Sequence, residues 1–176
     1  MAVRVDVSEI RKSPGMKVHL ELSSRLPPLE VEGQAVKFTG PARASLDVTN
    51  NGKALVVEGE VEAGLEVSCA RCLETFNFPV KVDFSEIYYP AGAEGISPEE
   101  REEWIPFVGE VLDLTPEVVK SIVLALPMRF ICREECRGLC PRCGKNLNLG
   151  ECHCSREGVD PRLAVLGDLL KEMKPR

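Results

Sequence analysis

The chain has 176 residues, an apolar fraction of 44% and a formal net charge of −6. This size and composition suit one ordinary domain, or one domain with a small appendage, and exclude wholesale disorder. The acidic balance is the opposite of what a stand-alone nucleic-acid-binding protein usually shows.

The charge is unevenly distributed along the chain. Residues 1–128 hold 12 Lys and Arg against 21 Asp and Glu, whereas residues 129–176 hold 10 against 7. We expect residues 1–128 to form an antiparallel sheet domain with a packing helix. Residues 129–176 are expected to form a cysteine-rich zinc module with a C-terminal helix, packed on the first part as one compact unit.

Alternation of apolar and polar residues predicts strands over the first ninety residues. They cover residues 18–22, 36–38 and 42–49, a long stretch that ends at Cys69, and residues 76–89. The pair Asn51-Gly52 predicts a two-residue type I′ turn, because both residues tolerate positive φ. These features predict a twisted antiparallel sheet or a partly open β-barrel without parallel βαβ order, an α+β fold once the helices are included.

Three helices are predicted after the strands. Ser97-Pro98-Glu99-Glu100 has the cap, proline and acids that begin a helix, which we expect to end near Trp104, and residues 107–114 suit a short edge strand. A second helix begins near Thr115 and ends before Pro127; it is apolar on most sides and is expected to be buried against the sheet. A third begins at Asp160, with a leucine stripe typical of a core-facing helix.

Six of the eight cysteines lie between Cys132 and Cys154. Cys140-Pro-Arg-Cys143-Gly144 has the form of a zinc knuckle, and Cys152-His153-Cys154 supplies a second close pair. We expect these four thiolates to bind one zinc ion, and a second site to combine Cys132 and Cys136 with Cys69 and Cys72. Any four of the six clustered cysteines remain possible ligands at this stage, and His153 is an alternative ligand.

Other roles for the cysteines are weaker. Disulfides need an oxidising compartment, but the first residues lack the apolar region of a signal peptide and no stretch is long enough to span a membrane, so we expect a cytoplasmic protein. A redox-active Cys69-Ala-Arg-Cys72 would need the N-terminus of a helix, whereas strands surround it. Unliganded buried cysteines would need apolar neighbours that the cluster lacks.

Together these motifs resemble the YceD family, whose members are described as large ribosomal RNA subunit accumulation proteins. The resemblance covers roughly residues 60–170. It rests on Cys69-Ala-Arg-Cys72-Leu73, the Leu-Ala-Leu-Pro run that ends at Pro127, the segment from Cys136 to Asn148, the Cys152 and Cys154 pair, and the Asp-Pro-Arg-Leu run from Asp160.

The resemblance implies a non-enzymatic role in large-subunit ribosomal RNA accumulation and ribosome assembly, with the RNA or its precursor as partner. We expect phosphate contacts from four bases of the cysteine cluster, Arg133, Arg137, Arg142 and Lys145, and Arg71 at the hairpin tip joins them if the two cysteine regions meet. The alternative is an adaptor whose acidic sheet binds a ribosomal protein. A zinc enzyme is disfavoured because His19 and His153 are the only histidines, and we expect no small-molecule substrate and no membrane.

Overall fold

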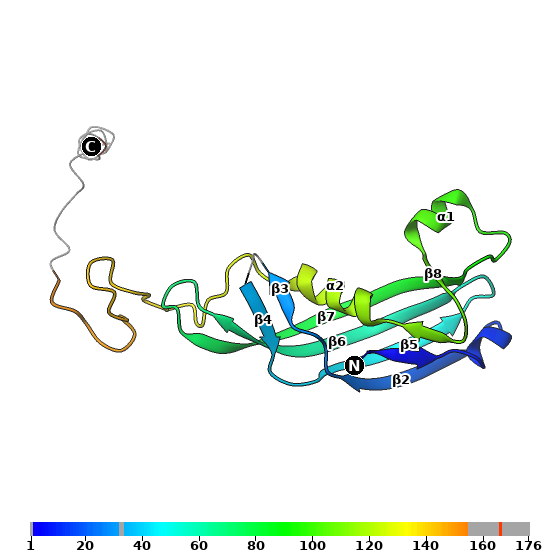
Figure 1. Cartoon of the computed structure of the whole chain (residues 1–176), viewed down its shortest axis with the longest axis horizontal. Helices are drawn as coiled ribbons and strands as arrows, with labels where there is room; N and C mark the ends of the chain where they lie inside the picture. Colours follow the sequence, from blue (N-terminus) through cyan, green and yellow to red (C-terminus); the bar gives the residue numbers. More distant parts are fainter. Residues whose placement is uncertain (1, 32–33, 155–165, 167–176) are drawn as a thin grey trace, which may run out of the picture.

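The computed structural model describes residues 2–31, 34–154 and 166. The fold is organised around a long antiparallel hairpin of β6 (Leu55–Ser68) and β7 (Thr75–Pro90), which runs through the length of the sheet (Figure 1). On its other edge β6 pairs with β5 (Ala42–Asn50), and β5 pairs with β2 (Lys17–Ser24). The predicted strands of this region are therefore present, and the tip of the hairpin carries Cys69 and Cys72.

Two short strands extend the same edge of β6 toward the hairpin tip. β4 (Gln34–Phe38) pairs with β6 at Lys37 and Phe38, and β3 (Leu29–Val31), which periodicity did not predict, pairs with β4. The strands form open sheets. The protein is thus mostly sheet, with α1 and α2 among its described elements, and the sheet is not closed into a barrel.

One face of the sheet carries the core and the other faces solvent. Along β5 the side chains of Ala44, Leu46 and Val48 are buried, and the residues between them are exposed or half-buried. A second layer covers the buried face, made of β1 (Arg4–Asp6), β9 (Val111–Asp113) and α2 (Thr115–Ala125). Valines and leucines of this layer share one apolar cluster with β5, β6 and β7.

The β5–β6 hairpin forms as predicted, but its turn differs from the predicted two-residue type I′ turn. Asn50 pairs with Leu55, so four residues connect the strands, and positive φ occurs at Gly52 but not at Asn51. The Asn51 side-chain oxygen accepts hydrogen bonds from the N–H groups of Lys53 and Ala54, at 3.0 and 2.8 Å. This side chain satisfies the turn donors, which allows the longer connection.

The expected edge strand over residues 107–114 is divided in two. β8 (Ile105–Phe107) follows α1 (Pro98–Glu103) and pairs in parallel with β7, so the expectation of no parallel βαβ order was wrong. β9 begins at Val111 and pairs instead with β1, a strand of three residues near the N-terminus. Strands this short show too little alternation to be detected by pattern.

The first two helices begin where the sequence predicted. Ser97 and Glu100 form a reciprocal capping box at the start of α1. In α2 the side chains of Val118 and Ile122 are buried in the core, but Leu124 is 76% exposed and Val123 38% exposed. The expectation that α2 packs against the sheet is therefore confirmed, although only one of its apolar faces is buried. The predicted third helix lies outside the described residues, apart from Leu166.

Candidate metal centres

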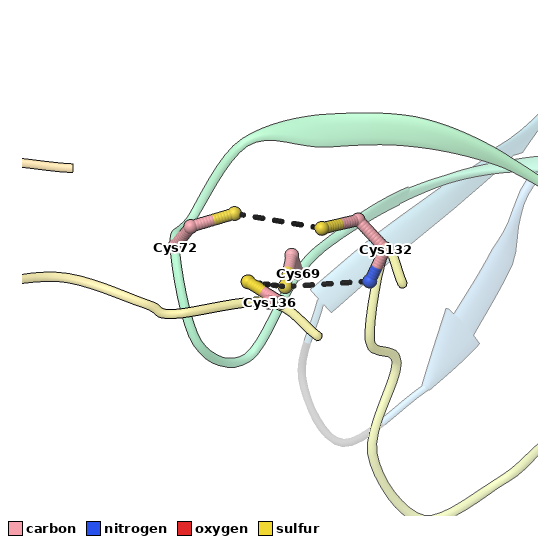
Figure 2. Close-up of side chains that lie close together, drawn as sticks. All are labelled: Cys69, Cys72, Cys132 and Cys136. Carbon is pink, nitrogen blue, oxygen red and sulfur yellow. Dashed lines mark hydrogen bonds between the residues drawn. The ribbon is translucent and has the colours of Figure 1, made fainter. Parts of the chain in front are cut away.

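The first group of thiols forms where the hairpin tip meets the chain that follows α2. Cys69 and Cys72 come from the tip, and Cys132 and Cys136 come from the returning segment (Figure 2). The Sγ atoms of Cys69 and Cys136 lie 3.8 Å apart, as do those of Cys72 and Cys132, and all four sulfurs lie within 4.8 Å of one another. Four thiolates arranged tetrahedrally at about 2.3 Å from a zinc ion have sulfurs about 3.8 Å apart.

Backbone hydrogen bonds hold the two segments together around this group. Ala70 donates its N–H to the carbonyl of Phe130 at 2.8 Å, and Leu139 donates to the carbonyl of Arg71 at 3.0 Å. The Arg71 guanidinium donates to the carbonyls of Glu134 and Cys136, at 3.0 and 3.1 Å. The segment over residues 130–139 is therefore fastened to the end of the long hairpin, although more than fifty residues separate the two along the chain.

The surroundings of these thiols favour a mixture of charge states. Burial raises the pKa of Cys69, but N–H groups of Cys132, Cys72 and Arg71 together outweigh it and bring that pKa to about 6. Burial and the neighbouring sulfurs raise the pKa of Cys132 to about 12. Because sulfurs this close repel one another as thiolates, a bound cation would favour ionisation of all four.

The second group consists of Cys140, Cys143, Cys152 and Cys154, whose sulfurs also lie within 4.8 Å of one another. The knuckle turn is closed by the N–H of Gly144, which donates to the carbonyl of Cys140 at 2.9 Å; its φ of 70° is one that glycine adopts without strain. Cys143 is exposed, whereas Cys69, Cys72 and Cys136 of the first group are buried. The second group is thus the more accessible of the two.

The two thiols at the ends of this second group differ in pKa. Hydrogen bonds from the backbone N–H groups of Cys143 and Arg142 lower the pKa of Cys140 to about 6. The hydrogen bond with Cys143 and burial raise the pKa of Cys154 to about 12. As in the first group, one sulfur is readily ionised while another holds its proton because its neighbours are close.

The loop that joins the two cysteine pairs of the second group contacts the first group. Asn148 donates its side-chain amide to the sulfur of Cys136 at 3.4 Å, and its side-chain oxygen accepts from the N–H of Arg137 at 2.9 Å. Leu147 donates its N–H to the carbonyl of Gly138 at 2.9 Å. The role of Asn148 was not predicted, because no spacing rule identifies an amide that supports a thiolate in this way.

The structure gathers the eight cysteines into the same two groups of four that the sequence pairs, and all eight are free thiols. His153, the alternative ligand, is exposed and belongs to neither group. The donor sets contain only sulfur, which is the set preferred by zinc and other thiophilic metals. Either group could hold one metal ion.

The five bases predicted to contact RNA are all exposed, but several also hold the module together. Arg71 fastens the two segments of the first group, as described above. Arg137 forms an ion pair with Glu151 at 3.3 Å, and Lys145 donates to the carbonyl of Glu151 at 2.7 Å. Arg133 and Arg142 lie on the same module, so all five surround the thiol groups.

Comparison with known proteins gives a family match. The family model described as "Large ribosomal RNA subunit accumulation protein YceD" matches residues 57–170. An uncharacterized protein of Mycobacterium tuberculosis is 32% identical over 168 residues, 94% of this chain and 80% of the relative. A chloroplastic protein of Arabidopsis thaliana, named "Large ribosomal RNA subunit accumulation protein YCED homolog 1", is 28% identical over 77% of this chain and 50% of its own length.

A third relative, the uncharacterized protein YlbN of Bacillus subtilis, is 28% identical over 84% of this chain and 77% of the relative. No solved structure matches the chain. Within the described residues, neither the length nor the apolarity of any helix is enough for a membrane crossing.

Proposed function

The chain belongs to the YceD family, and from that premise we propose that it is a zinc-binding, non-enzymatic factor that supports large-subunit ribosomal RNA accumulation and ribosome assembly. One zinc ion binds Cys69, Cys72, Cys132 and Cys136, and a second binds Cys140, Cys143, Cys152 and Cys154. We further propose that it acts in the cytoplasm. The observation that carries the proposal is the closeness of the sulfurs in two separate groups of four.

The two groups of sulfurs suit single structural zinc ions better than a metal cluster or a catalytic zinc. Each group has four sulfurs within 4.8 Å of one another, a set compact enough for one ion rather than a cluster of several metals. A catalytic zinc keeps an open position and usually has histidine or carboxylate ligands, neither of which belongs to these groups. Both ions would therefore have a structural role.

Metal binding would make a rigid contact surface at the end of the hairpin. A loop that is already ordered loses little conformational entropy when it binds RNA, so each weak phosphate contact contributes more to affinity. Arg133 and Arg142 are exposed on this module, and Arg71, Arg137 and Lys145 are exposed beside them. We propose that these bases contact phosphates of large-subunit ribosomal RNA or its precursor.

A specific observation supports the alternative, an adaptor for a basic ribosomal protein. The solvent face of β6 carries Glu58, Glu60 and Glu62, which alternate with Val57, Gly59 and Val61. Lys81 forms ion pairs with Glu60 and Glu62, at 2.8 and 3.4 Å, and so neutralises part of this charge. The net negative charge of this face is therefore smaller than the sequence indicates, and for this reason we prefer RNA as the partner.

Three measurements test the proposed function. Metal analysis of protein purified under reducing conditions should find zinc in both groups, and depletion of the protein in its host should lower large-subunit relative to small-subunit ribosomal RNA. Affinity for ribosomal RNA should fall steeply between low and physiological salt. Affinity that does not change with salt would reject phosphate contact and favour the adaptor.

A further inference from the structure

The solvent face of the sheet has a basic groove beside the end of β4, where β4 meets β6. A hollow of about 680 Å³ is lined by the ends of Arg43 and Lys81, by Glu62, and by Thr39 and Asn77. A smaller hollow of about 360 Å³ adjoins it, because both are lined by Thr39 and Gly40; its charged residues are Arg25 and Lys37. Together the two hollows carry four bases and one acid, although residues 1–128 are acidic overall.

Three of these bases have no ion pair within the part of the chain that the structure describes. The fourth base, Lys81, forms ion pairs with Glu60 and Glu62. Glu62, the one acid of the groove, is therefore neutralised by Lys81 and does not compete with a bound anion for the other three bases. Arg25, Lys37 and Arg43 are exposed and have neither an ion pair nor a side-chain hydrogen bond to any described residue. On the rest of this face the lysines are paired, for example Lys17 with Asp47 at 2.9 Å.

The floor of the larger hollow lacks a side chain. It is formed by Gly64 of β6, above which the Thr39 hydroxyl donates to the Asn77 side-chain oxygen at 3.2 Å. A Cβ atom at residue 64 would lie 2.4 Å from that hydroxyl and 2.9 Å from the Asn77 oxygen. Glycine at this position therefore leaves room for the contact between Thr39 and Asn77, which uses the Asn77 oxygen and not its amide nitrogen.

We propose that this groove binds the phosphodiester backbone of RNA, as a second contact surface beyond the cysteine module; the inference rests on the proposed function. The groove is open and its bases are spread over several strands, so it suits an extended polyanion rather than one small anion, which would need enclosure by buried donors. Its lining has four bases and one aromatic ring, the half-buried Phe38, so contacts with phosphates outnumber any stacking on bases.

The register places the groove in line with the cysteine module. Lys37 pairs with Glu66, three residues before Cys69, and Arg43 pairs with Glu62, seven residues before it. At about 3.3 Å per residue these positions lie roughly 10 and 23 Å from the hairpin tip. One RNA strand can therefore contact the module and continue along the groove.

The test uses full-length, zinc-loaded protein and a fluorescein-labelled single-stranded RNA of about 20 nucleotides, with binding followed by fluorescence anisotropy at several salt concentrations. The combined variant Lys37→Ala with Arg43→Ala should lose about tenfold in affinity at low salt, with a salt slope reduced by roughly one unit for each lost phosphate contact. Its melting temperature should stay unchanged, since neither side chain is paired. A matched control, Lys12→Ala with Lys53→Ala, removes two exposed bases elsewhere on the protein and should bind as wild type does.

Each contrary result has a distinct meaning. If the groove variant binds as tightly as wild type while Arg133→Ala weakens binding, the groove is rejected and the proposed function stands. If the wild-type protein binds no RNA at any salt, the RNA contact of the proposed function fails together with the groove. If poly-glutamate at equal charge concentration binds wild type more tightly than the RNA does, and the groove variant binds RNA as wild type does but loses the poly-glutamate, the surface binds acidic peptides and the inference is wrong.

Discussion

Leu73 and Gly144 occupy the same position in two similar turns, directly after the second cysteine of each Cys-x-x-Cys. Both have positive φ, 61° and 70°, and each donates its N–H to the carbonyl of the first cysteine at 2.9 Å. Glycine adopts this conformation freely, whereas leucine meets a clash between Cβ and the backbone. The Leu73 side chain is 66% exposed, so packing offsets little of this strain.

We predict that Leu73→Gly raises the free energy of unfolding by up to about 1 kcal/mol. Removing the strain of the left-handed conformation stabilises the folded state by about 1–2 kcal/mol. The greater conformational freedom of glycine stabilises the unfolded chain and offsets about half of this gain. Urea denaturation of the metal-loaded protein measures the change. Leu73→Ala is the control, because it removes the side chain and keeps the strain. Equal loss of stability in both variants would show that Leu73 packing matters more than its backbone.

A second prediction concerns Tyr88, whose hydroxyl is buried and has no hydrogen-bond partner among the described residues. Burial raises the pKa of this hydroxyl, and the nearby Glu117 and Glu86 carboxylates add to the effect. A buried donor without a partner costs about 1–3 kcal/mol, so Tyr88→Phe should stabilise the protein by about 1 kcal/mol in thermal or urea denaturation. Tyr89→Phe, whose hydroxyl is not buried in this way, should give no gain. A loss of stability in Tyr88→Phe would indicate an ordered water on the hydroxyl.

The pH dependence of stability should show the contribution of His19. Its ring nitrogens lie 2.8 Å from Asp47 and 3.0 Å from Glu21, and these hydrogen bonds raise the histidine pKa above 6.5. Protonated His19 therefore stabilises the fold fully below pH 6.5, and this contribution is lost as pH rises through the higher folded pKa. The lowered pKa values of Asp47 and Glu21 act in the opposite direction, and their contribution is lost as pH falls through the acidic range.

Denaturation between pH 5.5 and 8 should thus show a modest loss of stability in wild type that is absent in His19→Gln, since the side chain is 58% exposed and screened by solvent. Ser23→Ala on the same strand is a control that leaves the histidine in place. An unchanged pH profile in His19→Gln would exclude this cluster as the cause.

The sequence predicted the long strands because eight or more alternating residues give a clear pattern, as in β5 and β7. It placed the Cys69 pair at a hairpin tip for the same reason. It could not predict β1, or that the expected strand over residues 107–114 divides into β8 and β9 with different partners, because strands of three residues are fixed by their partners rather than by their own pattern. The Asn51 side-chain hydrogen bonds agree with the preference of asparagine for turns, but residue type alone does not distinguish a connection of four residues from one of two.

For the candidate site, the number and spacing of the cysteines predicted which thiols lie together. Four close cysteine pairs suggest two groups of four, and the structure gathers them so. What spacing could not give is the contact between Arg71 and the carbonyls of Glu134 and Cys136, or the amide of Asn148 on Cys136. Such support depends on three-dimensional orientation, as does the difference between paired and unpaired bases.

If both thiol groups bind zinc as proposed, the two sites should differ in how readily they lose the ion. Cys143 is exposed, whereas three of the four thiols in the first group are buried. A chelator added at increasing concentration should therefore remove the second-group ion first, measured by release of zinc to a colorimetric indicator. Cys143→Ser should abolish the early phase alone, and Cys69→Ser should abolish the late phase alone. Loss of both phases in Cys143→Ser would mean that the sites bind metal cooperatively.

The final prediction compares two glycines with the same backbone conformation. Gly138 and Gly144 both have a φ of 70°, but a Cβ at residue 138 would lie 2.9 Å from the carbonyl oxygen of Arg71, whereas nothing lies within 4 Å of one at residue 144. Gly144→Ala should therefore cost about 1 kcal/mol from backbone strain alone. Gly138→Ala should cost about 2 kcal/mol or more, because it also pushes apart the hairpin tip and the returning segment.

Hydrogen exchange at Leu139 separates the two effects, because its N–H donates to the same Arg71 carbonyl at 3.0 Å. In Gly138→Ala this amide should exchange faster, while amides in the centre of β6 keep their protection. In Gly144→Ala the Leu139 amide should exchange as in wild type. If the two variants lose equal stability and protect Leu139 equally, the close approach at Gly138 does not hold the cysteine module on the hairpin, and the Arg71 side chain and the Ala70 hydrogen bond hold it without this contact.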